Sequence, residues 1–157
     1  MKRSPYLVGA ISDTHGLMRP EALVALKGVD LVIHAGDIGK LEVIEALRSI
    51  AAVVAVRGNN DKGRWARGLP QTAVAEVGEV QIFVLHDIKE LDLDPVAKGI
   101  RVVISGHSHR PSITKQNGVL YLNPGSAGPR RFKLPVAVAR LRVERRSVDA
   151  EIVELNV

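Results

Sequence analysis

The sequence contains no cysteine, and this absence removes several kinds of chemistry at once. Disulfide bonds, zinc-thiolate centres and thiol nucleophiles are all excluded. If the protein holds a metal ion, the ligands must come from histidine, aspartate, glutamate or asparagine side chains. Nitrogen and oxygen ligands are therefore the ones to seek along the chain.

Aromatic residues and long apolar runs are also scarce. Phe, Trp and Tyr make up only 3% of the residues, which argues against a platform that stacks successive bases of a nucleic-acid strand. No run approaches the roughly 18 apolar residues of a membrane-spanning helix. The apolar stretch near the start stops at Asp13-Thr14-His15 without the small-residue cleavage pattern of a signal peptide. We expect a soluble, cytoplasmic protein with no membrane partner.

Basic residues outnumber acidic ones, which gives a net charge of +5 and a pI near 9.8. This charge favours anionic partners such as phosphates or nucleic acid, but Lys and Arg are spread along the chain, and a solvated basic surface is the simpler explanation. With 157 residues and 46% hydrophobic content, the chain can bury one sizeable core. We expect a single domain over residues 1–157. A homo-oligomer is compatible with the sequence, which does not reveal the oligomeric state.

The apolar pattern predicts an α/β fold. Runs that are apolar on both faces predict buried parallel strands, and stretches with an apolar period of about 3.6 residues predict helices. The strands are expected at 6–12, 31–35, 53–56 and 102–104, and the helices after Pro20, at 41–50 and at 91–98. Turn residues such as Asn117-Gly118 predict hairpins. These hairpins would pair 72–77 with 80–85, 111–116 with 119–122, and 136–143 with 148–155.

Polar side chains follow the predicted strands at the points where the strands end. Ligands of parallel sheets bind beyond these carboxyl ends, so we expect the side chains to meet there. The set consists of Asp13, His15, Asp37, Asn59, His86, His107 and His109. Four of the five histidines of the chain belong to it, and the exception, His34, lies in a predicted buried strand, where a core role is expected.

His107 and His109 are separated by one residue, as are Asp13 and His15. In an extended segment such a pair shares one side, roughly 6 to 7 Å apart at about 3.3 Å rise per residue. Because the ions of a dinuclear hydrolytic site lie roughly 3.5 to 4 Å apart, this spacing fits two metal ions better than one. Two solvated loop histidines would give the same local pattern, so the rest of the set must decide.

The set occurs as D-x-H, G-D, G-N-N-D, a single H and G-H-S-H, in that order. This series resembles the calcineurin-like metallophosphoesterase superfamily, especially its small YfcE-type phosphodiesterases, whose fold the retromer subunit Vps29 shares. The resemblance covers residues 10–131 and includes the loop N-P-G-S-A-G-P-R that begins at Asn123. It implies a metallophosphoesterase-type β-sandwich, with mainly parallel central strands flanked by helices and a C-terminal antiparallel hairpin.

The resemblance also implies a ligand set and a reaction. One metal ion would be held by Asp13, His15, Asp37 and His109, and the other by Asp37, Asn59, His86 and His107, so that Asp37 bridges the two. Mn²⁺ is expected first, with Fe, Zn²⁺ and Ni²⁺ as alternatives that oxygen and imidazole ligands do not distinguish. A hydroxide bridging the two ions would attack a small or nucleotide-like phosphodiester.

Asn60 departs from the wider superfamily, in which a histidine thought to assist the leaving group follows the ligand asparagine. The YfcE-like branch lacks this histidine too. An amide can hydrogen-bond a phosphate oxygen but does not supply a proton near neutral pH, so Asn60 is a candidate contact to the phosphate or the leaving group. We expect leaving groups of low pKa to be expelled fastest. Arg130 is a second candidate substrate contact, although basic loop residues are usually solvated.

Two other functions stay open at this point. Vps29 acts as a protein-interaction scaffold with a degraded metal site, whereas the ligands implied here are intact. A nuclease would agree with the basic charge, but the scarcity of aromatic residues disfavours a nucleic-acid partner.

Overall fold

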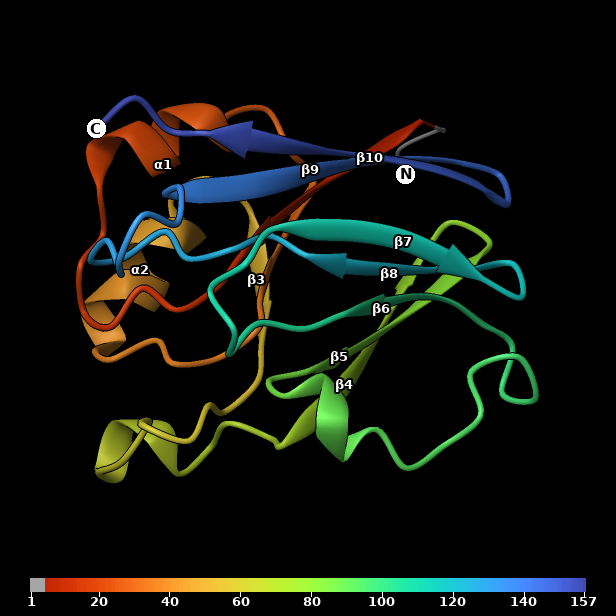
Figure 1. Cartoon of the computed structure of the whole chain (residues 1–157), viewed down its shortest axis with the longest axis horizontal. Coiled ribbons are helices and arrows are strands. Elements are labelled where there is room, and N and C mark those ends of the chain that lie inside the picture. The colour runs from red at the N-terminus through yellow and green to blue at the C-terminus, as the bar shows by residue number, and fades with distance from the viewer. Residues whose placement is uncertain (1–4) are drawn as a thin grey trace.

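The computed structural model describes residues 5–157, which form two five-stranded β-sheets with helices against one of them (Figure 1). The first sheet has the order β10-β9-β1-β2-β3. Its strands are β1 (Tyr6–Ile11), β2 (Leu31–His34), β3 (Ala52–Ala55), β9 (Ala137–Glu144) and β10 (Ser147–Glu154). The strands β1, β2 and β3 are parallel, and β9 and β10 add an antiparallel hairpin at the β1 edge.

The second sheet has the order β4-β5-β6-β8-β7. Its strands are β4 (Thr72–Val77), β5 (Val80–Leu85), β6 (Ile100–Ile104), β7 (Ser112–Gln116) and β8 (Val119–Asn123). The central strands β5, β6 and β8 are parallel, whereas β4 and β7 are joined to them as antiparallel hairpins. The β7–β8 turn contains Asn117 and Gly118, both with positive φ, as a two-residue turn of this hand requires.

The helices α1 (Pro20–Ala25) and α2 (Leu41–Arg48) connect the parallel strands of the first sheet. Pro20 suits the first position of α1, because proline lacks the N–H that would have no partner there. The apolar period of α2 places Val43, Ile44 and Leu47 on one buried face. Among the described residues, no helix is long and apolar enough to cross a membrane.

Apolar residues are buried in two main layers. In β1, Val8 and Ala10 belong to the layer between the sheets, whereas Ile11 belongs to the layer between the first sheet and the helices. Both faces of this strand are therefore covered, as its uninterrupted apolar run predicts. Trp65, in the short 3₁₀ helix Arg64–Ala66, packs at the margin of the second layer.

The α/β fold is confirmed, but the expected helix at 91–98 is wrong. The segment instead contains a 3₁₀ helix at Ile88–Glu90, followed by turns. Asp94 precedes a proline, which disfavours the helical conformation, and its carboxylate accepts a hydrogen bond from the Val96 N–H at 3.1 Å. Leu91 and Leu93 pack on a small apolar cluster of the second sheet.

Candidate metal centre

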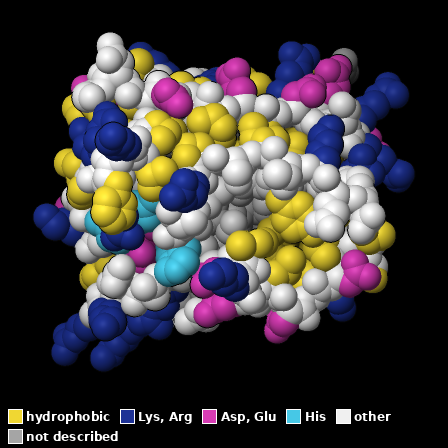
Figure 2. Space-filling model, in the orientation of Figure 1, with side chains coloured by type: hydrophobic (Ala, Val, Ile, Leu, Met, Phe, Trp, Pro, Cys, Tyr) yellow, Lys and Arg dark blue, Asp and Glu magenta, His cyan; other side chains and the backbone are white. Residues whose placement is uncertain are grey.

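Loops that follow the parallel strands of both sheets meet at one edge of the molecule. Residues 12–16 follow β1, 36–39 follow β2 and 58–61 follow β3, while 86 and 105–109 follow β5 and β6. On the face shown in Figure 2, histidine side chains reach the surface at the left, where Figure 1 shows these loops. All seven residues predicted from the sequence lie in these loops.

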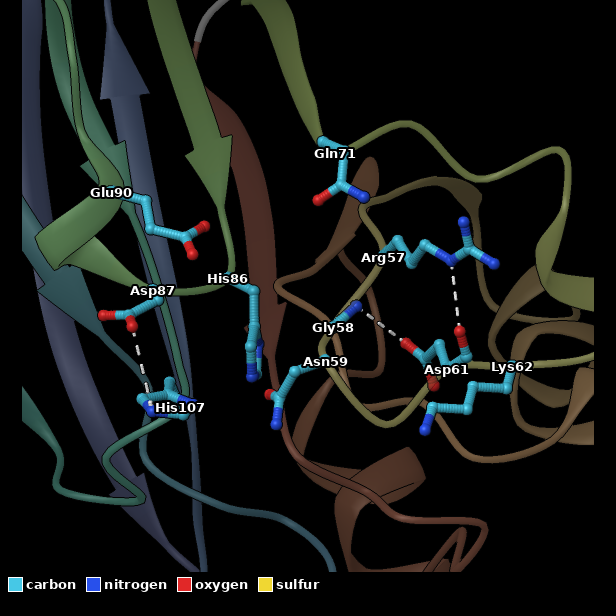
Figure 3. Close-up of a pocket in the computed structure, with 10 residues that line it drawn as sticks. All are labelled: Arg57, Gly58, Asn59, Asp61, Lys62, Gln71, His86, Asp87, Glu90 and His107. Atoms are coloured by element: carbon cyan, nitrogen blue, oxygen red, sulfur yellow. Dashed lines mark hydrogen bonds and ion pairs between the residues drawn. The ribbon is translucent and has the colours of Figure 1, made fainter.

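A cleft of about 420 Å³ opens at this edge. It is lined by Arg57, Gly58, Asn59, Asp61, Lys62, Gln71, His86, Asp87, Glu90 and His107. In Figure 3, His86 and His107 lie on one wall, Arg57 and Lys62 lie on the other, and Asn59 projects between the walls. The cleft thus brings together predicted ligands that are contributed by both sheets.

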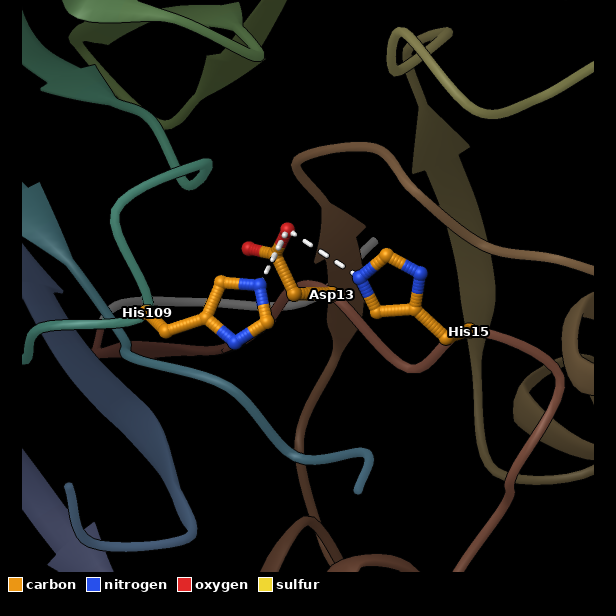
Figure 4. A group of neighbouring side chains, drawn as sticks. All are labelled: Asp13, His15 and His109. Carbon is orange, nitrogen blue, oxygen red and sulfur yellow. Dashed lines mark ion pairs between the residues drawn. The ribbon is translucent and has the colours of Figure 1, made fainter. Parts of the chain in front are cut away.

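Asp13, His15 and His109 form the more closed side of the centre. One carboxylate oxygen of Asp13, Oδ1, lies 3.4 Å from His109 Nε2 and 3.8 Å from His15 Nε2 (Figure 4). The two rings stack with centroids 5.5 Å apart. The nitrogen and oxygen atoms of the three residues are close enough together to bind one metal ion.

Asp13, Asp37 and His86 form a second such group. His86 Nε2 lies 3.3 Å from Asp37 Oδ2 and 3.9 Å from Asp13 Oδ1. Asp37 Oδ2 also lies 3.7 Å from His15 Nε2. Both carboxylates therefore lie between His15 and His86, and each faces the two sides of the centre.

His107 and Asn59 lie farther out than the other predicted ligands. The side chain of His107 is 46% exposed, its ring meets that of His86 edge-on at 5.2 Å, and its Nε2 lies 3.8 Å from Asp87 Oδ2. Asn59 is exposed and lines the cleft. The structure thus places both residues at the open side of the centre.

The residues of the centre fit a divalent cation. Asp13 Oδ1, His15 Nε2 and His86 Nε2 are buried but make no hydrogen bond to any part of the described chain. Buried polar atoms without partners are unfavourable, and most buried polar atoms in folded proteins have a partner. Carboxylate oxygen and imidazole nitrogen are ligands of Mn²⁺, Fe and Zn²⁺, so a bound cation would satisfy these atoms.

The backbone is unusual at the same residues. Asp13, His15, Asp37, His107 and His109 all have positive φ, between 47° and 70°. Residues other than glycine seldom adopt this conformation, which costs about 1–3 kcal/mol when the surroundings impose it and is concentrated at functional sites. The loops are thus held in the conformation that directs these side chains to the centre.

Comparison with known proteins identifies the family to which the chain belongs. Residues 6–146 match the calcineurin-like phosphoesterase superfamily domain. The chain belongs to this superfamily. A protein named probable metallophosphoesterase from Methanocaldococcus jannaschii is 35% identical, with 96% of this chain and 82% of the relative covered. Another from Methanothermobacter thermautotrophicus is 33% identical, with 94% and 91% covered.

Solved structures confirm the fold of the superfamily member. An archaeal phosphodiesterase is 25% identical with a TM-score of 0.76, and covers 94% of this chain and 99% of its own. A single-residue variant of Vps29 from Entamoeba histolytica is also 25% identical with a TM-score of 0.74, and covers 96% of this chain and 99% of its own. The fold is thus found both in an enzyme and in a protein named for vacuolar sorting.

In this member of the superfamily, hydrogen bonds between loops hold the carboxylates in place. Asp13 Oδ2 accepts from Ser12 Oγ at 2.8 Å and from the His107 N–H at 3.0 Å, which links the two sheets. Asp37 accepts from the backbone N–H of Asn60 at 2.9 Å and from its side-chain amide at 3.2 Å. Sequence reasoning missed this role of Asn60, because it depends on a contact across 23 residues.

Asp61 and His34 join the loops without facing the centre. Asp61 is buried and accepts from the N–H groups of Ile38, Gly39 and Gly58 at 2.9–3.2 Å. His34 Nδ1 accepts from the Gly36 N–H at 3.1 Å, so Nε2 carries the proton and donates to Thr14 Oγ1 at 3.0 Å. Thr14 in turn donates to the Ile38 carbonyl at 2.8 Å. His34 is therefore a buried structural residue.

Two glycines permit close contact between the loops. A Cβ at Gly58 would collide with the backbone N of Asp37, and a Cβ at Gly106 would collide with Ser12 Oγ and approach Asp13 Oδ2 within 2.6 Å. The G-N-N-D and G-H-S-H motifs therefore need glycine at these positions for steric reasons as well as for turn geometry.

Burial and charge act in opposite directions on the ionisable groups. Burial is the largest influence on Asp37 and opposes its ionisation, but His86 and the Asn60 N–H outweigh it and lower the pKa of Asp37 to about 2. Burial disfavours the charged form of His86, yet Asp37, the Ala35 carbonyl and Asp13 together raise its pKa to about 9. Burial raises the pKa of Asp13.

The other predicted or considered residues have different surroundings. Arg130 is exposed and donates to the Val157 carbonyl at 3.3 Å, near the C-terminus, and does not line the cleft. Asp87 faces His107. His86 is oriented by the Ala35 carbonyl, to which its Nδ1 donates at 2.7 Å. Asn123 donates to the Gly106 carbonyl at 2.9 Å and thereby holds the G-H-S-H loop.

Proposed function

We propose that the protein is a phosphodiesterase that hydrolyses small or nucleotide-like phosphodiesters with two divalent metal ions, Mn²⁺ first among Mn²⁺, Fe, Zn²⁺ and Ni²⁺. The observation that carries this proposal is the pair of carboxylate-histidine groups that share Asp13 and have unpartnered buried atoms. A phosphodiesterase of Methanocaldococcus jannaschii is 29% identical, with 75% of this chain and 82% of the relative covered, which supports the choice of reaction.

The proposed ligands divide between the two sides of the centre. Asp13, His15, Asp37 and His109 would hold one ion, and Asp37, Asn59, His86 and His107 would hold the other. The short distances from Asp37 Oδ2 to His15 and to His86 support its assignment to both ions. The outer position of Asn59 and His107 agrees with an ion that lies next to the cleft.

The chain contributes position and charge to the reaction. When bound, divalent ions lower the pKa of a water molecule and stabilise charge on phosphoryl oxygens. Asp13 and Asp37 neutralise only half of the charge of two dications, so the centre attracts an anionic ester. The cleft wall that carries Arg57 and Lys62 is positively charged, whereas Asp87 and Glu90 lie on the opposite wall (Figure 3).

Asn60 determines which products leave readily. Its backbone N–H and its side-chain amide both face Asp37, and an amide does not donate a proton to a departing oxygen. A leaving group that is stable as an anion, such as nitrophenolate, therefore needs no help, whereas an alkoxide does. The cleft volume of about 420 Å³ suits a substituent of small-molecule size.

Hydrolysis of bis-p-nitrophenyl phosphate with Mn²⁺ tests the proposal. Release of nitrophenolate should require added Mn²⁺ and stop when a chelator is added. The Asp149→Asn variant, which alters an exposed carboxylate of β10, should behave like the unmodified protein. Absence of turnover with every one of the four metals would refute the proposed activity.

The same assay separates the enzyme from a scaffold. Vps29 of Entamoeba histolytica has been seen in complex with Zn²⁺, in a structure with a TM-score of 0.73 and 24% identity, so metal binding alone does not distinguish the two functions. Metal binding without turnover would favour a scaffold. Cleavage of single-stranded DNA or RNA that persists at moderate salt would instead indicate a nuclease.

A further inference from the structure

Phe132, in the loop between β8 and β9, combines two unusual features. Its side chain is 88% exposed, and its φ is 55°, a conformation that bulky residues rarely adopt. Among the described residues, eight other than glycine have positive φ: five are proposed metal ligands, and Asn117 and Arg145 lie in two-residue hairpin turns. Phe132 is the remaining one, at the second position of a turn that the Leu134 N–H closes on the Arg131 carbonyl at 3.1 Å, where glycine or asparagine is the usual residue with positive φ.

The loop that carries Phe132 is fixed to the metal centre. Ser126 Oγ donates to the Asp13 carbonyl at 3.0 Å, and a Cβ at Gly128 would collide with that carbonyl and with the carbonyl of Thr14. Phe132 follows Gly128 by four residues, which span at most about 14 Å even when fully extended. The Cα of Phe132 therefore lies within about 14 Å of Gly128, which itself contacts the backbone of Asp13 and Thr14.

Basic residues surround this ring in the sequence R-R-F-K, residues 130–133. Arg131 precedes Phe132 directly, and both side chains are exposed, so a guanidinium and an aromatic ring lie on the same loop. Figure 2 shows hydrophobic and basic side chains beside the histidines, in the region where Figure 1 shows the β8–β9 loop. An exposed aromatic face next to a cation and a phosphate-binding centre matches the two parts of a nucleotide, a flat base and a charged phosphate.

We propose that Phe132 recognises the substrate by stacking on the base of a nucleoside substituent, with Arg131 beside the phosphate. A single ring provides a place for one base and not for a strand, so the substrate class is a mononucleotide ester. Because this role rests on the proposed function, its test must separate base recognition from hydrolysis itself.

Two substrates with the same leaving group make this separation. The p-nitrophenyl ester of thymidine 5′-monophosphate and methyl p-nitrophenyl phosphate both release nitrophenolate, but only the first carries a base. The Phe132→Ala variant should lower the ratio of kcat/KM for the nucleotide ester to that for the methyl ester about tenfold, mainly through KM. Phe132→Trp should restore the ratio, and Phe132→Leu should not, because leucine is apolar but has no ring face.

Val96→Ala is the matched control. Val96 is also an exposed apolar loop residue, at 54%, but it lies in the connection between β5 and β6. Its ratio should equal that of the unmodified protein. Thermal unfolding of each variant should occur at an unchanged temperature, because the ring of Phe132 is exposed.

A binding measurement gives an answer that does not depend on turnover. Adenosine 5′-monophosphate titrated into the Zn²⁺-loaded Phe132→Trp variant should quench tryptophan fluorescence. The unmodified protein, whose half-buried Trp65 packs against the apolar layer, should not respond. An unmodified protein that hydrolyses neither ester would refute the proposed function, while this titration would still decide the role of Phe132.

Four results would overturn the inference. The ratio of the two esters could be unchanged in Phe132→Ala, Phe132→Leu could restore it as well as Phe132→Trp, or the titration could leave the fluorescence unchanged. A loss confined to oligonucleotide cleavage would also refute it, because the substrate would then be a strand.

Discussion

The two sheets contribute different halves of the metal centre. Loops of the first sheet supply both carboxylates, Asp13 and Asp37, which are buried and held by hydrogen bonds from neighbouring loops. Loops of the second sheet supply the imidazoles of His86, His107 and His109, of which His107 is half exposed and lies beside Asp87 and the ring of His86. The negative charge of the centre is thus fixed, whereas part of its nitrogen half is open to solvent.

This difference indicates a division of labour. A fixed pair of carboxylates defines where cations bind, because their charge and position are set before any ion arrives. In the proposed centre, the histidines of the second sheet would complete the coordination from across the interface, so an ion bound there would connect the two sheets. Changes on the first-sheet side should therefore have the larger effects, and changes on the second-sheet side the smaller ones.

The largest effect is expected from Asp37→Asn, which keeps the shape of the side chain but removes its charge. Residues that merely orient metal ligands contribute about 10- to 100-fold in activity or affinity. Loss of a carboxylate that we propose is shared by both ions should therefore lower phosphodiesterase kcat/KM by more than about 100-fold. Turnover of bis-p-nitrophenyl phosphate and metal content by mass spectrometry measure this. His107→Ala should lose less, because its ring is partly exposed; an equal or greater loss would contradict the division between the sheets.

The next effect concerns stability and is expected from Asp61→Ala. Three buried or half-buried N–H groups would lose their acceptor, and each costs about 1–3 kcal/mol when left without one, so the free energy of unfolding should fall by about 3 kcal/mol. Asp94→Ala, which removes one acceptor in an exposed loop of the second-sheet side, should cost less than about 1 kcal/mol. Urea unfolding compares the two variants. Similar losses of unfolding free energy would show that the hydrogen bonds between the first-sheet loops do not stabilise them more than those of the second-sheet side.

Much of the fold follows from local sequence. The run at β1 is apolar on both faces, and Asn117-Gly118 specifies its hairpin turn, so these elements are predictable from a few residues. The division of the strands into two sheets is not predictable in this way, because an apolar run indicates that a strand is buried but not which strand it pairs with. Only the resemblance to a known family implied a sandwich of two sheets. The helix expected at 91–98 is wrong because Asp94 forms a turn before Pro95, and Leu91 and Leu93 pack on the second sheet from a segment without helical structure.

The candidate site shows the same limit. Its seven predicted residues could be found because parallel strands deliver their following residues to one edge. The positive φ angles, the acceptor role of Asp61 and the donation from Asn60 to Asp37 depend on contacts between loops that are distant in sequence. For the same reason, no sequence pattern reveals that Arg130 bonds to the carbonyl of Val157.

A smaller effect is expected from pH on the metal-free protein. The pKa of His86 is raised to about 9 from 6.5, so the folded state binds the extra proton between these values. The stabilisation is complete below pH 6.5 and is lost as pH rises through about 9, by about 1–3 kcal/mol. Asp37 does not contribute to this change, because its lowered pKa of about 2 affects stability only in acid.

Urea unfolding of the chelated protein at pH 6.5 and pH 9 measures this loss. His86→Asn should remove the difference, and bound Zn²⁺ should remove it as well, because the ion displaces the proton. A chelated protein that is equally stable at both values would show that His86 does not hold a proton across the interface between the sheets.

The smallest effect on activity, and the most selective for the leaving group, is expected from Asn60→His in the loop after β3, where Asn60 contacts Asp37. A histidine there can donate a proton to a departing oxygen, which helps a poor leaving group and does little for nitrophenolate. For a series of methyl aryl phosphates, kcat/KM should rise up to about tenfold for the most basic leaving groups, so that its dependence on leaving-group pKa becomes shallower. Asn60→Ala, which removes the amide donated to Asp37 without adding an acid, should lower all rates alike. If Asn60→His changed kcat/KM by the same factor for every leaving group, this position would act through Asp37 alone. The first-sheet half would then control metal binding but not the departure of the leaving group.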